Sequence, residues 1–145
     1  MQVRCSLVVA AALALVAAGC ASSKAADTTT RMKQAHELRA LERPTVREIK
    51  LTFIALMLRH DGRAAERLER AAEDGHTVLE WVDDHRSFAR ANEPTVDCLE
   101  ESLGELRERA EQMAPALRDR SLEAGERIEL RRALAEAANC IQAGD

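Results

Sequence analysis

Two cysteines place the strongest constraint on how this 145-residue chain can fold. Cys98 and Cys140 each lie 21 residues from position 119, which falls in a predicted break between two helical segments. Because an α-helix rises about 1.5 Å per residue, folding the two segments antiparallel brings both cysteines to the open end of one hairpin. A disulfide there would stabilise the fold by about 4 kcal/mol in the loop-entropy model. The alternative is a pair of buried free thiols.

The segment before this break has the pattern of a closely packed helix. Its apolar residues recur at alternating spacings of three and four, which is a heptad pattern. The predicted helix begins at Pro94 and ends near Pro115, and a final helix covers about Ser121–Ile141. The apolar residues of the heptad pattern are Val96, Leu99, Leu103, Leu106, Ala110 and Met113.

The rest of the chain also shows helical spacing, and no segment alternates as a strand does. Ala, Leu, Arg and Glu dominate the composition and are strong helix formers. The sequence therefore predicts an all-α fold, a small helical bundle of about five helices over residues 31–145 that ends in the antiparallel hairpin. The earlier predicted segments are Thr30–Arg43, Thr45–His60, Arg63–Asp74 and Val78–Ala91.

The segment 45–60 is predicted to be the most buried helix and the centre of the core. Its apolar residues, from Val46 to Leu58, cover most of the helix circumference. The segment 63–74 offers mainly alanines, so it is expected to pack closely or to lie at the edge. Pro44 and Gly75 mark predicted breaks, and Thr77 with Glu80 has the spacing of a capping box.

The first twenty residues contain the three parts of an export signal. Arg4 supplies positive charge, Leu7–Ala18 form an apolar block, and small residues precede Cys20. The run Ala17-Ala18-Gly19-Cys20 resembles the lipobox of bacterial lipoproteins, in which cleavage falls before a cysteine that already carries diacylglycerol. Members of that family usually have Leu where this chain has Ala17.

The resemblance implies that residues 1–19 are removed and that Cys20 is acylated. Each buried methylene contributes about 0.8 kcal/mol to membrane binding, and a lipoprotein cysteine carries several chains such as palmitate, so attachment would be firm. Residues 20–30 would then form the lipidated cysteine and a flexible tether. Ala21 after the cysteine favours the outer membrane, on its periplasmic face.

Two other interpretations of the signal segment stay open. An uncleaved membrane helix is one, although the apolar block is shorter than the roughly 18–20 residues that span a bilayer. Ordinary cleavage after Ala18 or Ala21 is the other. Cleavage after Ala18 without acylation would leave an odd number of cysteines, whereas acylation of Cys20 leaves Cys98 and Cys140 to pair.

The charge pattern argues against some partners. The formal net charge is −4, with both signs interspersed along the chain. No basic stripe fits nucleic acid, and no polybasic segment fits anionic lipid headgroups. We therefore expect no nucleic-acid binding.

The sequence predicts no catalytic, cofactor-binding or metal-binding residues. None of the four histidines has a spacing that demands a metal, although His76 and Glu80 could share a helix face with Asp83 or Asp84. Trp81, His85 and Phe88 fall on one side of their helix. Core or half-buried surface is the ordinary interpretation of such a cluster, and a binding patch is the alternative.

Together these patterns favour a non-enzymatic envelope lipoprotein that binds or escorts another envelope protein. It is similar in architecture to the helical pilotin lipoproteins, and in architecture alone. The alternative is an enzyme or ligand carrier that acts on peptidoglycan or lipid in an interhelical pocket, with His85, Glu80 or Asp84 converging there. A third possibility is a stress or spacer lipoprotein of the envelope.

Overall fold

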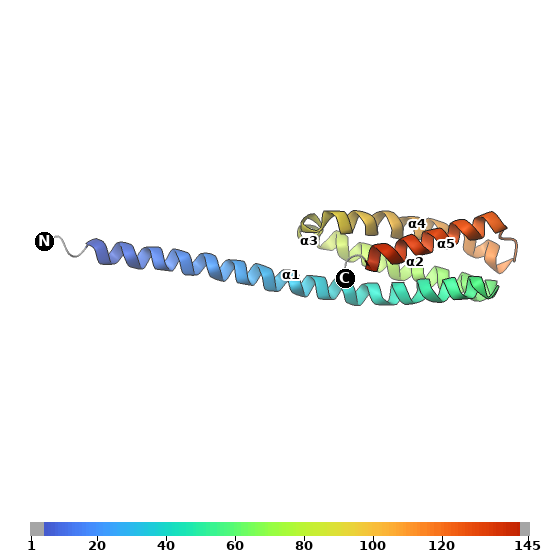
Figure 1. Ribbon diagram of the computed structural model, residues 1–145, viewed down its shortest axis with the longest axis horizontal. Coiled ribbons are helices and arrows are strands. Elements are labelled where there is room, and N and C mark those ends of the chain that lie inside the picture. The colour runs from blue at the N-terminus through green and yellow to red at the C-terminus, as the bar shows by residue number, and fades with distance from the viewer. Residues whose placement is uncertain (1–4, 143–145) are drawn as a thin grey trace. The chain divides into compact units, whose positions relative to one another are not determined.

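The computed structural model describes the backbone of residues 5–142 and the side chains of residues 27–142. Within this range the chain forms five helices and no strand, which confirms the predicted all-α fold (Figure 1). The chain divides into two units, residues 1–36 and residues 37–145. The helices are α1 (Cys5–Met57), α2 (Asp61–Asp84), α3 (Arg86–Ala91), α4 (Glu93–Arg118) and α5 (Ala124–Gln142).

The second unit is an antiparallel bundle with an aliphatic core. α2 packs along α4, α4 packs along α5, and the short α3 joins α2 to α4 (Figure 1). All six residues of the predicted heptad pattern in α4 are buried, so that prediction is confirmed. The side chains with no exposed surface include Ala64, Ala65, Leu68, Ala71, Val78, Val82, Leu99, Leu106, Leu117, Leu130, Leu134 and Ala137.

The predicted centre of the core was wrong. α2, rather than the end of α1, supplies six of the fully buried residues. Five of those six are alanine or valine side chains, and small side chains let helix backbones approach closely. At the end of α1 only one face is covered, and Phe53, Ile54, Met57 and Leu58 are exposed.

The predicted break at Pro44 is also absent. α1 continues through Pro44, whose ring lies on the exposed side of the helix. A proline in a helix removes one hydrogen bond and strains the preceding turn. Leu38 and Glu42 before the proline, and Thr45 and Ile49 after it, are all buried. Packing on both sides of the proline thus keeps the two segments in one helix.

α2 likewise continues through Gly75, and the predicted capping box does not form. The Thr77 hydroxyl donates to the carbonyl oxygen of Glu73 at 3.3 Å, as in the interior of a helix. Gly75 is buried, and a Cβ atom there would lie 3.2 Å from Cδ2 of Leu103. The glycine therefore marks a close approach between α2 and α4, and not a break.

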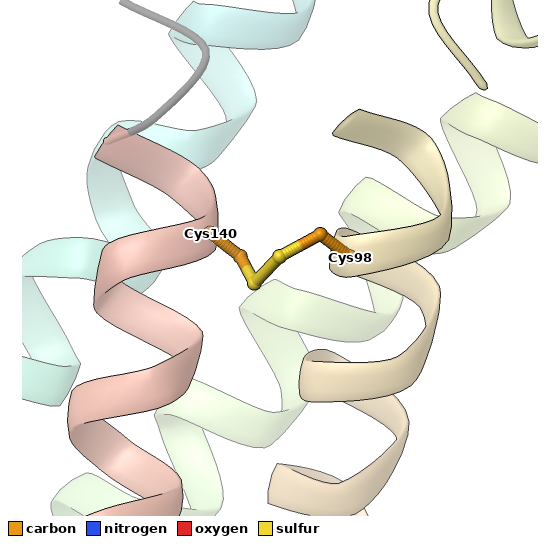
Figure 2. The surroundings of a disulfide bond; sticks show 2 residues. All are labelled: Cys98 and Cys140. Atoms are coloured by element: carbon orange, nitrogen blue, oxygen red, sulfur yellow. A yellow bond between two sulfur atoms is a disulfide. The ribbon is translucent and has the colours of Figure 1, made fainter. Parts of the chain in front are cut away.

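The C-terminal hairpin forms as predicted. α4 and α5 lie antiparallel, and a disulfide joins Cys98 to Cys140 with a Cα–Cα distance of 5.6 Å. Figure 2 shows the two side chains pointing toward each other from the start of α4 and the end of α5. The predicted end of the helix near Pro115 was wrong: α4 continues through Pro115 to Arg118, and the turn lies at residues 119–123.

The predicted signal segment and the side chain of Cys20 lie outside the residues whose side chains are described. Residues 21–30, predicted to form a flexible tether, have a helical backbone within α1. No proline or glycine occurs between Cys20 and Pro44 to interrupt the helix, and Asp27 forms an i,i+4 ion pair with Arg31 at 3.0 Å. Among the described residues, no helix has the length and apolar character needed to cross a bilayer.

Candidate functional site

Large apolar side chains lie exposed at the end of α1. Phe53, Ile54, Met57 and Leu58 have exposed fractions of 39% to 60%. Spacings of one, three and four place them on one broad side of the helix. Scattered exposed apolar residues are ordinary, but a contiguous group rimmed by polar residues marks an interaction surface.

α5 extends this group across a helix–helix boundary. Nη1 of Arg131 lies 3.7 Å from the sulfur of Met57, so this side of α5 faces the end of α1. Ile128, 61% exposed, precedes Arg131 by three residues and therefore lies on the same side of α5. We call the five residues Phe53, Ile54, Met57, Leu58 and Ile128 the apolar face.

Positive side chains precede the apolar face on α1, and the carboxylates of this part of the helix are less exposed than they are. Arg43, Arg47 and Lys50 are exposed on the same helix. The two acidic residues of this part of α1, Glu42 and Glu48, are much less exposed. Glu42 is buried, and the Glu48 side chain is only 12% exposed and accepts two hydrogen bonds from Arg67 of α2.

The acidic residues of α5 are also engaged by other groups, and the first of them, Glu126, accepts a hydrogen bond from the backbone N–H of Glu123 at 2.8 Å. Glu129 lies 3.0 Å from Arg109 of α4, and Glu136 pairs with Arg132 at 3.8 Å on α5 itself. The side of α5 that faces α1 thus presents Ile128 and Arg131. The combined surface is apolar at one end and cationic along its length, in a chain whose net charge is negative.

A groove continues from this surface toward the other end of α5. It has a volume of about 360 Å³ between α1 and α5 and opens to solvent. Three cations line it from α1, together with one carboxylate and one apolar side chain, and two residues line it from α5: Arg39, Arg43, Lys50, Glu42, Val46, Ile141 and Gln142. The α1–α5 boundary is therefore hollowed beside the cationic residues.

The residues predicted for a catalytic or ligand pocket do not converge. The His85 ring stacks on Trp81 with centroids 3.9 Å apart, and its Nδ1 lies 2.7 Å from the Trp81 carbonyl oxygen. Phe88 meets the same indole edge-on at 5.4 Å, so this cluster packs the junction of α2 and α3. Glu80 pairs instead with His76 at 3.4 Å, and Asp84 is exposed.

A second open groove lies between α2 and α4. His76 and Glu73 line it from α2, and Arg107 and Glu111, which pair with each other at 3.3 Å, line it from α4. Within the part of the chain that has described side chains, no three His, Cys, Asp or Glu residues are grouped to hold a metal ion. The groove thus offers paired charges on an open surface and no enclosed reaction chamber.

Two carboxylates have shifted pKa values, and both lie in structural positions. The hydrogen-bonded Arg127 guanidinium holds the pKa of Asp61 below its usual value, against the opposing effect of burial. Burial, with the nearby charges of Glu48 and Glu73, raises the pKa of Asp74. Neither group faces a partner nucleophile or an enclosed cavity, so these shifts report packing.

Comparisons of the chain with protein-family models, with curated proteins and with solved structures find no match. The candidate site therefore depends on the geometry of the chain itself. The sequence contains one signal for the apolar face. The run Leu51–Leu58 is apolar except for Thr52, which exceeds what one buried helix face can hold.

Proposed function

We propose that this protein is a lipid-anchored lipoprotein of the bacterial cell envelope with a non-enzymatic role in binding or escorting another envelope protein. Residues 1–19 would be removed, and acylated Cys20 would hold the bundle at the periplasmic face of the outer membrane. In this respect it would be similar in architecture to the helical pilotin lipoproteins. The observation on which the proposed role rests is the apolar face.

The apolar face supports a binding role for an energetic reason. Burying apolar surface contributes about 25 cal/mol per Å². Ile54, Met57 and Leu58 are exposed to water, so a partner that covers them would gain this free energy on binding. Side chains at i, i+3 and i+4 on a helix are the usual anchors of helix-in-groove recognition.

The rest of the bundle supports the same role by its rigidity. The Cys98–Cys140 disulfide joins the last two helices, and α5 contributes Ile128 to the apolar face. A surface built on packed helices loses little conformational entropy when a partner binds. The described residues give no comparable arrangement for catalysis, because Glu80 pairs with His76, His85 stacks on Trp81 and Asp84 is exposed.

The anchor is tested by the intact mass of the protein extracted from membranes. We expect the mass of residues 20–145 plus a diacylglyceryl group and an amide-linked acyl chain. Cys20→Ser should abolish acylation and leave the precursor. An unmodified chain that begins at residue 19 or 22 would contradict acylation and indicate ordinary signal cleavage.

The binding role is tested by the native size of the protein in a mild detergent extract of the envelope. We expect a complex larger than one acylated chain of residues 20–145 in its detergent micelle, which Ile54→Asp dissociates because a buried unpaired charge is costly. Met32→Ser is the matched control, since Met32 is also exposed but lies on residues 1–36. Migration of the parent protein as a monomer would contradict the role.

A further inference from the structure

We propose that the α1–α5 groove and the apolar face together bind an acidic amphipathic helix of a partner protein. This inference rests on the proposed function and specifies the chemistry of the partner. The charge, the shape and the residue spacing of the surface support it.

The charge of the surface selects an acidic partner. Among the described residues, Arg43, Arg47 and Lys50 form no ion pair with a carboxylate, and Arg59 at the end of α1 forms none either. Of the two carboxylates nearby on α1, Glu48 pairs with Arg67, and Glu42, which lines the groove, is buried, so the exposed charge of the groove is positive. Complementary charge favours an acidic partner and disfavours a basic one.

The same charge argues against a second copy of this chain. An isologous contact through the apolar face would bring Arg47 and Lys50 of one copy close to the same cationic surface of the other, where Glu48 is already paired with Arg67. Like charges at an interface cost binding free energy. A protein with a different, acidic surface avoids that cost.

The shape of the surface favours a helix over a lipid bilayer. The groove is hollowed between two helices, with Val46 on one wall and Ile141 on the other. A helix about 10 Å wide can lie along such a boundary, whereas a flat bilayer cannot follow it. Val46 and Ile141 offer apolar contact, and Arg43 and Lys50 offer cationic contact, as an acidic amphipathic helix requires.

The spacing predicts how the partner's residues are arranged. Lys50 and Arg43 precede Ile54 by four and eleven residues along α1, or about 6 and 16 Å at a rise of 1.5 Å per residue. A helix lying along the groove would place its apolar anchors against Ile54 and Leu58. Its carboxylates would then lie about four to eleven residues away on the same side.

The test uses two synthetic helical peptides of equal length. Both have leucines at spacings of three and four in one half. In the other half one peptide has glutamates four to eleven residues from the leucines, and the matched peptide has lysines there. Binding to the full chain in phosphatidylcholine nanodiscs is measured by fluorescence anisotropy at two salt concentrations.

We expect the glutamate peptide to bind at least about tenfold more tightly than the lysine peptide, and to weaken as salt rises. Lys50→Glu and Arg43→Glu should each weaken it several-fold, and Ile54→Asp should abolish binding. Arg90→Glu, an exposed cation on α3, is the matched control and should leave binding unchanged. Circular dichroism of each variant verifies that the bundle remains helical.

Equal binding of the two peptides, or binding of neither, would overturn this inference. Ile54-dependent binding to phosphatidylglycerol vesicles without peptide binding would overturn it in favour of a lipid surface, and an Ile54-dependent dimer would overturn it in favour of a second copy. The native complex in envelope extracts is a separate observation. If that complex persists while the peptides fail, the proposed function stands and only the acidic helix is wrong.

Discussion

Arg127, near the start of α5, donates two parallel hydrogen bonds to the carboxylate of Asp61, the first residue of α2. Nη1 donates to Oδ1 at 2.8 Å, and Nη2 donates to Oδ2 at 2.6 Å. The two side chains are only 17% and 10% exposed. This bidentate pair fastens α5 to α2 across 66 residues of sequence, at the end of the bundle where α1 turns into α2.

Arg127→Met should destabilise the fold by about 1–3 kcal/mol at pH 7, because it leaves Asp61 charged and largely buried without its partner. The pKa of Asp61 is lowered in the folded state, so the pair stabilises the fold above the unfolded pKa of about 3.9. That stability is lost as the pH falls through the lowered pKa. The difference between parent and variant in urea unfolding should therefore shrink below about pH 4.

The control for this prediction is Arg118→Met. Arg118 pairs with Glu69 across α4 and α2, but both side chains are about half exposed. Exposed pairs contribute about 0–1 kcal/mol. Equal losses in the two variants would contradict the importance of burial at Asp61.

Removal of the disulfide should destabilise the fold by about 4 kcal/mol, because the unfolded chain regains the entropy of a loop of 42 residues. The measurement is urea unfolding of the protein with and without reductant. Cys98→Ala with Cys140→Ala should match the reduced parent and should not respond to reductant. Two titratable thiols in the denatured, unreduced protein would contradict the bond.

Gly75→Ala should stabilise the fold less than Gly104→Ala does. Alanine is the better helix former by about 1 kcal/mol at both positions. At Gly75, however, the new Cβ would lie 3.2 Å from Cδ2 of the buried Leu103, whereas nothing lies within 4 Å at Gly104. Thermal unfolding of both variants checks the difference, and equal gains would show that α2 and α4 are farther apart than described.

Thr45→Val should stabilise the fold by about 1 kcal/mol. The Thr45 hydroxyl is buried and has no hydrogen-bond partner, so replacing it with a methyl group of similar shape removes a desolvation cost. Thr52→Val is the control, because the equally buried Thr52 hydroxyl donates to the Glu48 carbonyl oxygen at 2.8 Å. A gain at position 52 and none at position 45 in urea unfolding would reverse this account.

The hairpin was predictable from sequence because its determinants are local and geometric. The heptad pattern in α4, the turn near position 119 and the equal distances of Cys98 and Cys140 from that turn all depend on helix periodicity. The boundaries at Pro44 and Gly75 were not predictable in this way. There tertiary packing outweighs the local preference of proline and glycine to end a helix.

The candidate site was only partly predictable for a related reason. The apolar run in residues 51–58 is visible in the sequence, but its exposure depends on how many helices surround the end of α1. The low exposure of the Glu48 carboxylate depends on Arg67, which lies 19 residues further along the chain and donates a hydrogen bond to it. Such contacts between distant residues appear only once the helices are arranged in space.

The central claim, that the apolar face binds an envelope protein, is tested most directly by photo-crosslinking in living cells. The full chain would contain p-benzoylphenylalanine in place of Ile54, with the exposed position Glu108 on α4 as the control site. We predict a discrete protein adduct from position 54, absent from position 108, whose crosslinked peptide is helical and acidic. No adduct at position 54, or equal adducts at both positions, would contradict the account.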